Sequence, residues 1–115
     1  MSGSKISAMQ TAKLIILNAH FYGEEKERPI SRYKISRNTL RIISDRAALR
    51  DSFIIELEHA MAELGWLFVQ NNDDECCFMV MTTTGNWAKL SSKRLTSFIK
   101  DPETIDDEYE HKCEL

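Results

Sequence analysis

The sequence is poor in the residues that build covalent and metal-bound frameworks. Its 115 residues include three cysteines, Cys76, Cys77 and Cys113, and three scattered histidines, His20, His59 and His111. An odd number of cysteines without a Cys-x-x-Cys pair gives neither a disulfide framework nor a metal-ligand spacing. We therefore expect a protein of a reducing, cytoplasmic compartment that holds no metal and no cofactor.

Long apolar runs and catalytic motifs are also missing. No run approaches the ~20 apolar residues that span a bilayer, so no membrane partner is expected. The four glycines are isolated and form no phosphate-binding loop. Glu56, Glu58 and Glu63 fall on the expected outer face of a helix, where carboxylates mostly serve solvation rather than catalysis. These features indicate that the chain is not an enzyme.

Charge is present but unevenly distributed. The net charge is −3. Residues 101–115 hold seven acidic residues against Lys112, which leaves fourteen Lys/Arg and eleven Asp/Glu, a balance of +3, in the first hundred. We expect one domain over residues 1–100, mildly basic, and an acidic, mobile tail over residues 101–115. The tail either keeps the protein soluble, folds over a basic surface or binds a basic partner.

Hydrophobic periodicity predicts three helices in the first part of the chain. They are expected over residues 6–22, 37–43 and 46–64. Gly23 and Gly65 are expected to end the first and the long helix, and Ser36 to cap the short one. The apolar positions of the long helix, four and three residues apart, are Leu49, Phe53, Leu57, Met61 and Leu64.

Two apolar runs after the long helix predict a β-hairpin. Trp66–Gln70 and Cys76–Met81 are expected to be strands, joined by the polar turn Asn71–Glu75. Both strands are apolar on both faces, so each face is expected to meet the core or another chain. Residues 30–35 are expected to be extended and could supply a short first strand. Farther along, a last helix or turn that packs back on the body is predicted from Trp87, Leu90, Leu95, Phe98 and Ile99.

Cationic side chains crowd around the junction of the short and the long helix. Six cations fall within nineteen residues, with Asp45 the sole acid between them. In a helix-turn-helix, the second helix enters the major groove with its first turn while the first helix lies against the backbone. We expect Arg46 and Arg50 to contact base edges or phosphates, because the arginine fork grips both. The predicted nucleic-acid-binding residues are Arg32, Lys34, Arg37, Asn38, Arg41, Ser44, Arg46 and Arg50.

The order of the predicted elements from Ile6 to Met81 resembles the winged helix-turn-helix superfamily. The resemblance covers about two thirds of the chain and depends on element order, the corner from Ser36 to Arg50 and the passage into a hairpin at Gly65. It implies an α+β, winged-helix-like fold with three or four helices and a β-hairpin, and a DNA-binding regulator of transcription. A dimer on double-stranded DNA is expected, because operators often have two-fold symmetry.

Acidic segments leave other functions open. The predicted wing carries Asp73, Asp74 and Glu75, which phosphates repel. The chain is alternatively a protein-interaction module, of inhibitor or anti-repressor type, that binds a basic partner through its acidic helix, hairpin tip and tail. The arginines would then form a solvated surface whose ion pairs contribute ~0–1 kcal/mol each. A third alternative is a small-molecule sensor built on the aromatic residues around Trp66 and Trp87.

Overall fold

The structure, a computed structural model, describes residues 5–72 and 74–113. Its α-helices and strands, in chain order, are α1 (Ala8–Lys26), β1 (Arg32–Ser36), α2 (Arg37–Ser44), α3 (Asp51–Glu63), β2 (Trp66–Asn71), β3 (Glu75–Val80), α4 (Thr96–Lys100) and α5 (Ile105–Cys113). Short 3-10 helices lie at Met81–Asn86, Lys93–Leu95 and Pro102–Thr104. This confirms the predicted α+β fold with a β-hairpin, and the order of elements up to β3 is compatible with a winged-helix-like domain. The fifth helix, α5, lies in the segment that was expected to be a tail.

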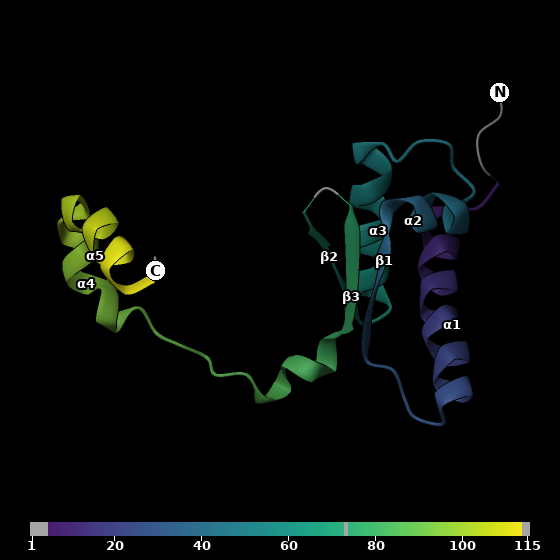
Figure 1. The fold of residues 1–115 in the computed structure, drawn as a ribbon, viewed down its shortest axis with the longest axis horizontal. Coiled ribbons are helices and arrows are strands. Elements are labelled where there is room, and N and C mark those ends of the chain that lie inside the picture. The colour runs from purple at the N-terminus through teal and green to yellow at the C-terminus, as the bar shows by residue number, and fades with distance from the viewer. Residues whose placement is uncertain (1–4, 73, 114–115) are drawn as a thin grey trace.

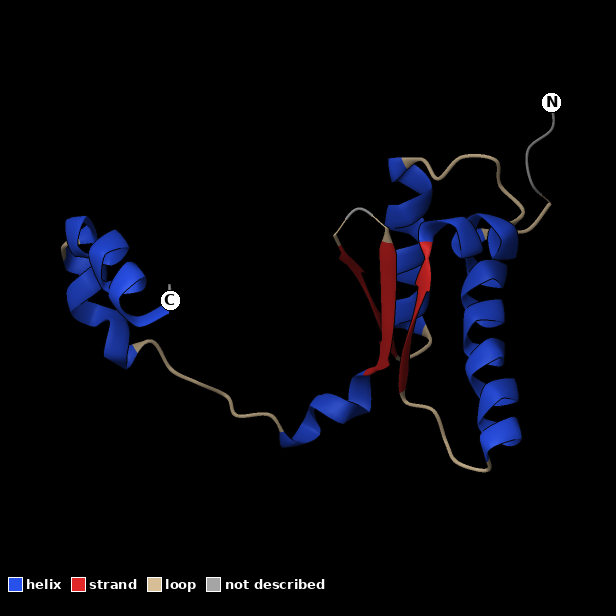
Figure 2. Ribbon diagram, viewed as in Figure 1, coloured by secondary structure: helices blue, strands red, loops and turns tan. Residues whose placement is uncertain are grey.

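The three strands form one antiparallel sheet in the order β1-β3-β2 (Figure 1). Tyr33 in β1 and Phe68 in β2 both lie opposite Phe78 in β3. Their ring centroids lie 5.5 and 5.2 Å from that of Phe78. Helices α1, α2 and α3 stand to one side of the strands (Figure 2), so this aromatic row connects the sheet to the helices.

The hydrophobic core lies between the sheet and the first three helices. Side chains at alternate strand positions point into it, as the two-residue period of a strand requires. The strand residues that are buried in the core are Trp66, Phe68, Cys76 and Phe78. The large apolar helix residues that are fully buried are Ile15, Leu40, Leu57 and Met61. Because burying one large apolar side chain contributes ~1.5–3 kcal/mol, residues 5–86, which we call the body, have a core of their own.

Tyr33 joins the sheet to α1. Its hydroxyl donates a hydrogen bond to the carbonyl of Ile15 at 2.6 Å. Burial disfavours the phenolate and raises the pKa of Tyr33 to about 12. The phenol therefore stays protonated and keeps its donor at any physiological pH.

Helix α1 is longer than the sequence pattern indicated. It begins with a reciprocal capping box between Ser7 and Gln10 and continues through Gly23, which was expected to stop it, to Lys26. A side chain at Gly23 would place its Cβ 2.8 Å from the carbonyl oxygen of Arg28. The prediction was wrong because Gly23 does not end the helix. Its missing side chain instead allows the chain after the helix to pack closely against it.

Helix α3 is shorter than predicted and begins at Asp51 instead of Arg46. The preceding helix, α2, ends at Ser44 and is followed by Asp45, which has a left-handed backbone with φ of 56°. The Asp45 N–H donates to the carbonyl of Ile42 and the Arg46 N–H to that of Arg41, the pair of hydrogen bonds that defines a Schellman motif. Residues 46–50 therefore form a loop, and the expected placement of Arg46 and Arg50 on one helical turn is wrong.

The C-terminal helices do not pack back on the body, in contrast to the prediction. Residues 93–113, which we call the arm, lie apart from the sheet at the end of an extended connector (Figure 1). Trp87, Leu90, Leu95 and Ile99 are 61, 73, 50 and 64% exposed. The radius of gyration is 18.9 Å, whereas a compact domain of this length has about 13 Å.

Candidate nucleic-acid interface

The N-terminus of α2 is fixed by its cap and by the hairpin. The Ser36 hydroxyl accepts a hydrogen bond from the Thr39 N–H at 3.1 Å, as the sequence predicts for an N-cap. The Arg37 backbone N–H donates to the carbonyl of Asp74 at 2.8 Å. The Arg37 guanidinium donates to the side-chain oxygen of Gln70 at 2.7 Å. Helix α2 is thus held against the tip of the β2–β3 hairpin.

Three of the predicted residues meet at one hollow beside α2. Arg37, Asn38 and Arg41 line it together with the loop at residues 47–49 and Asp74, and its volume is about 420 Å³. The Arg41 guanidinium donates to the carbonyl of Ala47 at 3.2 Å and to the side-chain oxygen of Asn38. Among the described residues, Lys34 forms an ion pair with Glu75, whereas Arg37 and Arg41 form none. We call this cationic site the α2 hollow.

Arg46 does not line the α2 hollow. Its guanidinium donates to the carbonyls of Ile6 and Ser44 at 3.0 and 3.1 Å. The guanidinium carbon lies 3.8 Å from the centre of the Phe53 ring, which is a cation–π contact. Arg46 therefore ties together the segment before α1, the end of α2 and the side of α3, and this geometry does not suit the predicted contact with base edges.

Ser44 and Arg50 have opposite surroundings. Ser44 is completely buried, and its hydroxyl donates to the carbonyl of Arg41 at 3.3 Å. This burial removes Ser44 from the set that a phosphate could reach. Arg50 is exposed at the N-cap of α3, directly after the loop that lines the α2 hollow. Its side chain makes no hydrogen bond or ion pair to the residues that the structure describes.

Arg32 and Lys34 lie elsewhere, on the outer face of the sheet. In the register of β1 and β3 they are opposite Met79 and Cys77. The Lys34 ammonium donates to the Glu75 carboxylate at 2.8 Å. This hydrogen bond raises the pKa of Lys34 and lowers that of Glu75. The eight predicted residues therefore do not form one ridge: four surround or adjoin the α2 hollow, two lie on the sheet and two are used in packing.

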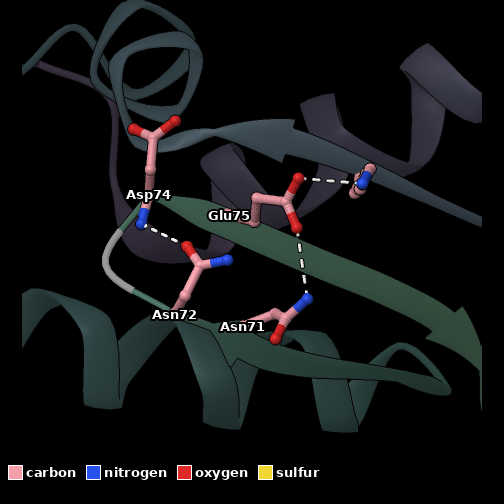
Figure 3. Close-up of polar contacts among 5 residues, drawn as sticks. Asn71, Asn72, Asp74 and Glu75 are labelled. Atoms are coloured by element: carbon pink, nitrogen blue, oxygen red, sulfur yellow. Dashed lines mark hydrogen bonds and ion pairs between the residues drawn. The ribbon is translucent and has the colours of Figure 1, made fainter.

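The hairpin tip is organised by polar side chains (Figure 3). The backbone N–H of Asp74 donates to the side-chain oxygen of Asn72 at 2.8 Å, and the Asn71 amide donates to Glu75 at 3.1 Å. Asn72 has a left-handed backbone with φ of 56°. Asp73, which was predicted to lie at the wing tip, is outside the described residues. The neighbouring Asp74 and Glu75 offer carboxylates where a phosphate-binding wing would offer cations.

The outer face of α3 is acidic. Its sequence, Asp51–Glu63, contains no lysine or arginine, and the exposed carboxylates are Asp51, Glu56, Glu58 and Glu63. In a winged helix this second helix of the helix-turn-helix would face the major groove. Like charges would repel such a helix from phosphates, so the charge of α3 does not suit a helix that enters the major groove.

Sequence reasoning missed the parts of the α2 hollow that come from the backbone. Ala47 and Ala48 fell inside the long helix that the apolar periodicity predicted from Arg46, and Gln70 carried no signal for a contact with Arg37. The left-handed Asp45 is the residue that separates the two helices, and aspartate is among the few non-glycine residues that adopt this conformation readily. An aspartate after a helical run is the available signal, and it is a weak one.

Other site types find no support in the described ranges. No three His, Cys, Asp or Glu side chains there are arranged to hold a metal ion. Among the described residues, no helix has the length and apolarity that crossing a bilayer requires. No family model, curated protein or solved structure matches this chain, so its candidate site is defined by its own geometry.

Proposed function

We propose that the body binds double-stranded DNA through phosphate contacts made by the α2 hollow and Arg50. The observation that carries the proposal is the convergence of Arg37, Asn38 and Arg41 on one hollow. Asp74 also lines this hollow, but among the described residues it forms no ion pair with either arginine. Cationic groups of this kind displace the counterions that surround duplex DNA, which provides most sequence-independent affinity. The proposed role is that of a DNA-binding regulator whose backbone contacts fix its position on the duplex.

The negative charge of α3 restricts which surface of the body could face DNA. Phosphate contacts from the start of α2 and from Arg50 need only the surface of the body near the loop at residues 46–50. The major groove would not receive the middle of α3, because its carboxylates would approach phosphates. The proposal therefore predicts weak sequence preference and a strong dependence on salt.

The test is a fluorescence polarisation titration with a labelled generic duplex at several salt concentrations. Changing Arg41 and Arg50 together to glutamine should lower the affinity on the order of tenfold per lost phosphate contact at ~0.1 M salt. The slope of log K against log salt should become shallower by about 0.9 per contact. The matched control is Lys13→Gln with Lys26→Gln, which removes two exposed cations from α1.

Two results would contradict the proposal. If the Arg41/Arg50 variant binds duplex DNA as the wild type does, the α2 hollow is not the site. If the wild type shows no binding even at low salt, DNA is not the partner. Circular dichroism and urea unfolding of both variants would establish that their folds are intact.

The acidic face of α3 favours one second candidate, a module that binds a basic protein. Four exposed carboxylates lie on this helix, and Ile55 beside them is 51% exposed. An unstructured lysine-rich peptide is a suitable probe. It should bind the wild type and lose affinity when Glu56 and Glu63 are changed to lysine, whereas Arg41→Gln with Arg50→Gln should leave the peptide affinity unchanged.

A further inference from the structure

The outer face of the sheet carries an apolar strip bordered by cations. In the strand register, Met79 lies between Arg32 and Leu67, and Cys77 lies between Lys34 and Val69. Residues directly opposite in an antiparallel pair share a face, so these six side chains form two adjacent rows. They line a shallow hollow of about 340 Å³. Val69 is 56% exposed, although its strand has a buried opposite face.

The arm has helices but no hydrophobic core. No residue between 93 and 113 is buried. Its apolar side chains surround a hollow of about 310 Å³, and Leu95, Ile99, Ile105 and Tyr109 are 45–64% exposed. Helices α4 and α5 have five and nine residues, whereas isolated helices shorter than ~12–15 residues are marginal in water. The arm therefore needs a surface that covers its apolar side.

The charges of the two surfaces are complementary. From Asp101 to Cys113 the arm contains six acidic residues against Lys112. The apolar strip of the sheet is bordered by Arg32 and Lys34. Lys34 is paired with Glu75 on the same face, so the positive charge of this face comes from Arg32, whose guanidinium has no partner among the residues that the structure describes. An apolar, acidic helix pair thus fits an apolar, basic sheet face.

We propose that the arm of one copy covers the outer sheet face of a second copy, and that the exchange is reciprocal. Each chain carries both surfaces, so two copies related by a two-fold axis close the interaction and leave neither surface unpaired. The arm is held away from its own sheet by the extended connector and not folded beneath it (Figure 1). The interface would bury the apolar strip, the arm hollow and the borders of opposite charge together.

The first test is the oligomeric state of the full chain, measured by sedimentation equilibrium over a range of concentrations. The wild type should be a dimer. Val69→Glu on the sheet and Ile99→Asp on the arm should each raise the dimer dissociation constant on the order of tenfold or more, because each places a charge in an apolar contact. The matched control is Ile42→Asp on α2, where an apolar side chain is 70% exposed outside both surfaces.

The second test separates exchange between chains from folding of the arm onto its own sheet. Cys77 lies on the sheet face and Cys113 lines the arm hollow, so a short bis-maleimide can link them. In a mixture of ¹⁵N-labelled and unlabelled protein, mass spectrometry should find Cys77–Cys113 peptides that join one labelled and one unlabelled chain. A wild type that is monomeric throughout, a dimer that neither variant weakens, or a link confined to single chains would each overturn the proposal. None of these outcomes bears on the binding of DNA, because the α2 hollow is not part of either surface.

Discussion

At the scale of single residues, arginines of similar sequence context have different tasks. Arg41 and Arg50 are exposed, whereas Arg46 is half-buried and hydrogen-bonded to two backbone carbonyls. The sequence could predict that cations gather near this corner, because their number is a matter of composition. The sequence could not predict which of these arginines face solvent. Their exposure depends on the loop at residues 46–50 and on the position of Phe53.

Replacing Arg46 with alanine should destabilise the fold. The substitution removes the contact with Phe53, worth ~0.5–1 kcal/mol or more, and two hydrogen bonds, so we expect a loss of about 2 kcal/mol in the free energy of unfolding. Urea unfolding followed by circular dichroism measures it. Arg50→Ala, which removes an exposed arginine with no such contacts, should change stability by no more than ~0.5 kcal/mol. Equal stability of the two variants would show that Arg46 has no packing role.

At the scale of elements, the hydrophobic pattern predicted the type and order of the helices and strands up to β3, but not the bounds of every helix. Phe53, Leu57 and Met61 are buried as their spacing indicates, whereas Leu49 and Leu64, at the two ends of the predicted pattern, lie outside α3. The wrong helix bounds fall at residues whose type is compatible with more than one local structure. Gly23 permits close packing as well as a helix end, and the run after Asp45 contains good helix formers that lie in a loop. The conformational preference of a single residue cannot fix where such a helix begins or ends. That point depends on contacts with distant residues or with the chain beyond the helix.

Alanine should destabilise the fold at Gly23 and at Gly65, but for different physical reasons. At Gly23 the added Cβ would lie 2.8 Å from a backbone oxygen, closer than real contacts allow. At Gly65 nothing lies within 4 Å, but the φ of 85° strains any side chain. We expect Gly23→Ala to cost about 1–3 kcal/mol through overpacking and Gly65→Ala about 1–2 kcal/mol through backbone strain. Thermal unfolding measures both.

The position of the clash allows a more specific check. A compensating shift of the segment from Glu27 to Ile30 would relieve the contact at Gly23 but not the strain at Gly65. Amide chemical shifts of this segment should therefore change in Gly23→Ala and stay as in the wild type in Gly65→Ala. Unchanged stability of Gly23→Ala would show that the chain after α1 is free to move away from the helix.

At the scale of the whole molecule, the chain consists of a body with a core and an arm without one. Sequence reasoning assigned residues 87–99 to the body because their apolar side chains suggest a helix or turn that packs back on it. Such residues show that a segment has an apolar side, but they do not show which surface covers it. The same limit applies to the candidate site, since the charge pattern named eight residues and only the fold sorts them into three surroundings.

A chain that ends at residue 92 should fold. The buried core residues that the structure describes all lie between Thr11 and Phe78, so the truncated chain should keep a cooperative unfolding transition and the circular dichroism of the body. It should also be monomeric, with a transition midpoint that does not depend on protein concentration. Loss of cooperative unfolding would contradict the division into body and arm, and a remaining dimer would locate the interface elsewhere.

The adjacent cysteines of β3 point to opposite sides of the sheet. Cys76 is completely buried, and burial raises the pKa of its thiol, whereas Cys77 is half-buried on the outer face. The reactivity of the two neighbouring thiols toward an alkylating reagent would therefore depend on different conformational equilibria. In the dimer that we propose, alkylation of Cys77 would be slower than in the separated copies but would still occur, and alkylation of Cys76 would follow global unfolding. One tryptic peptide from this protein would thus record association and folding side by side.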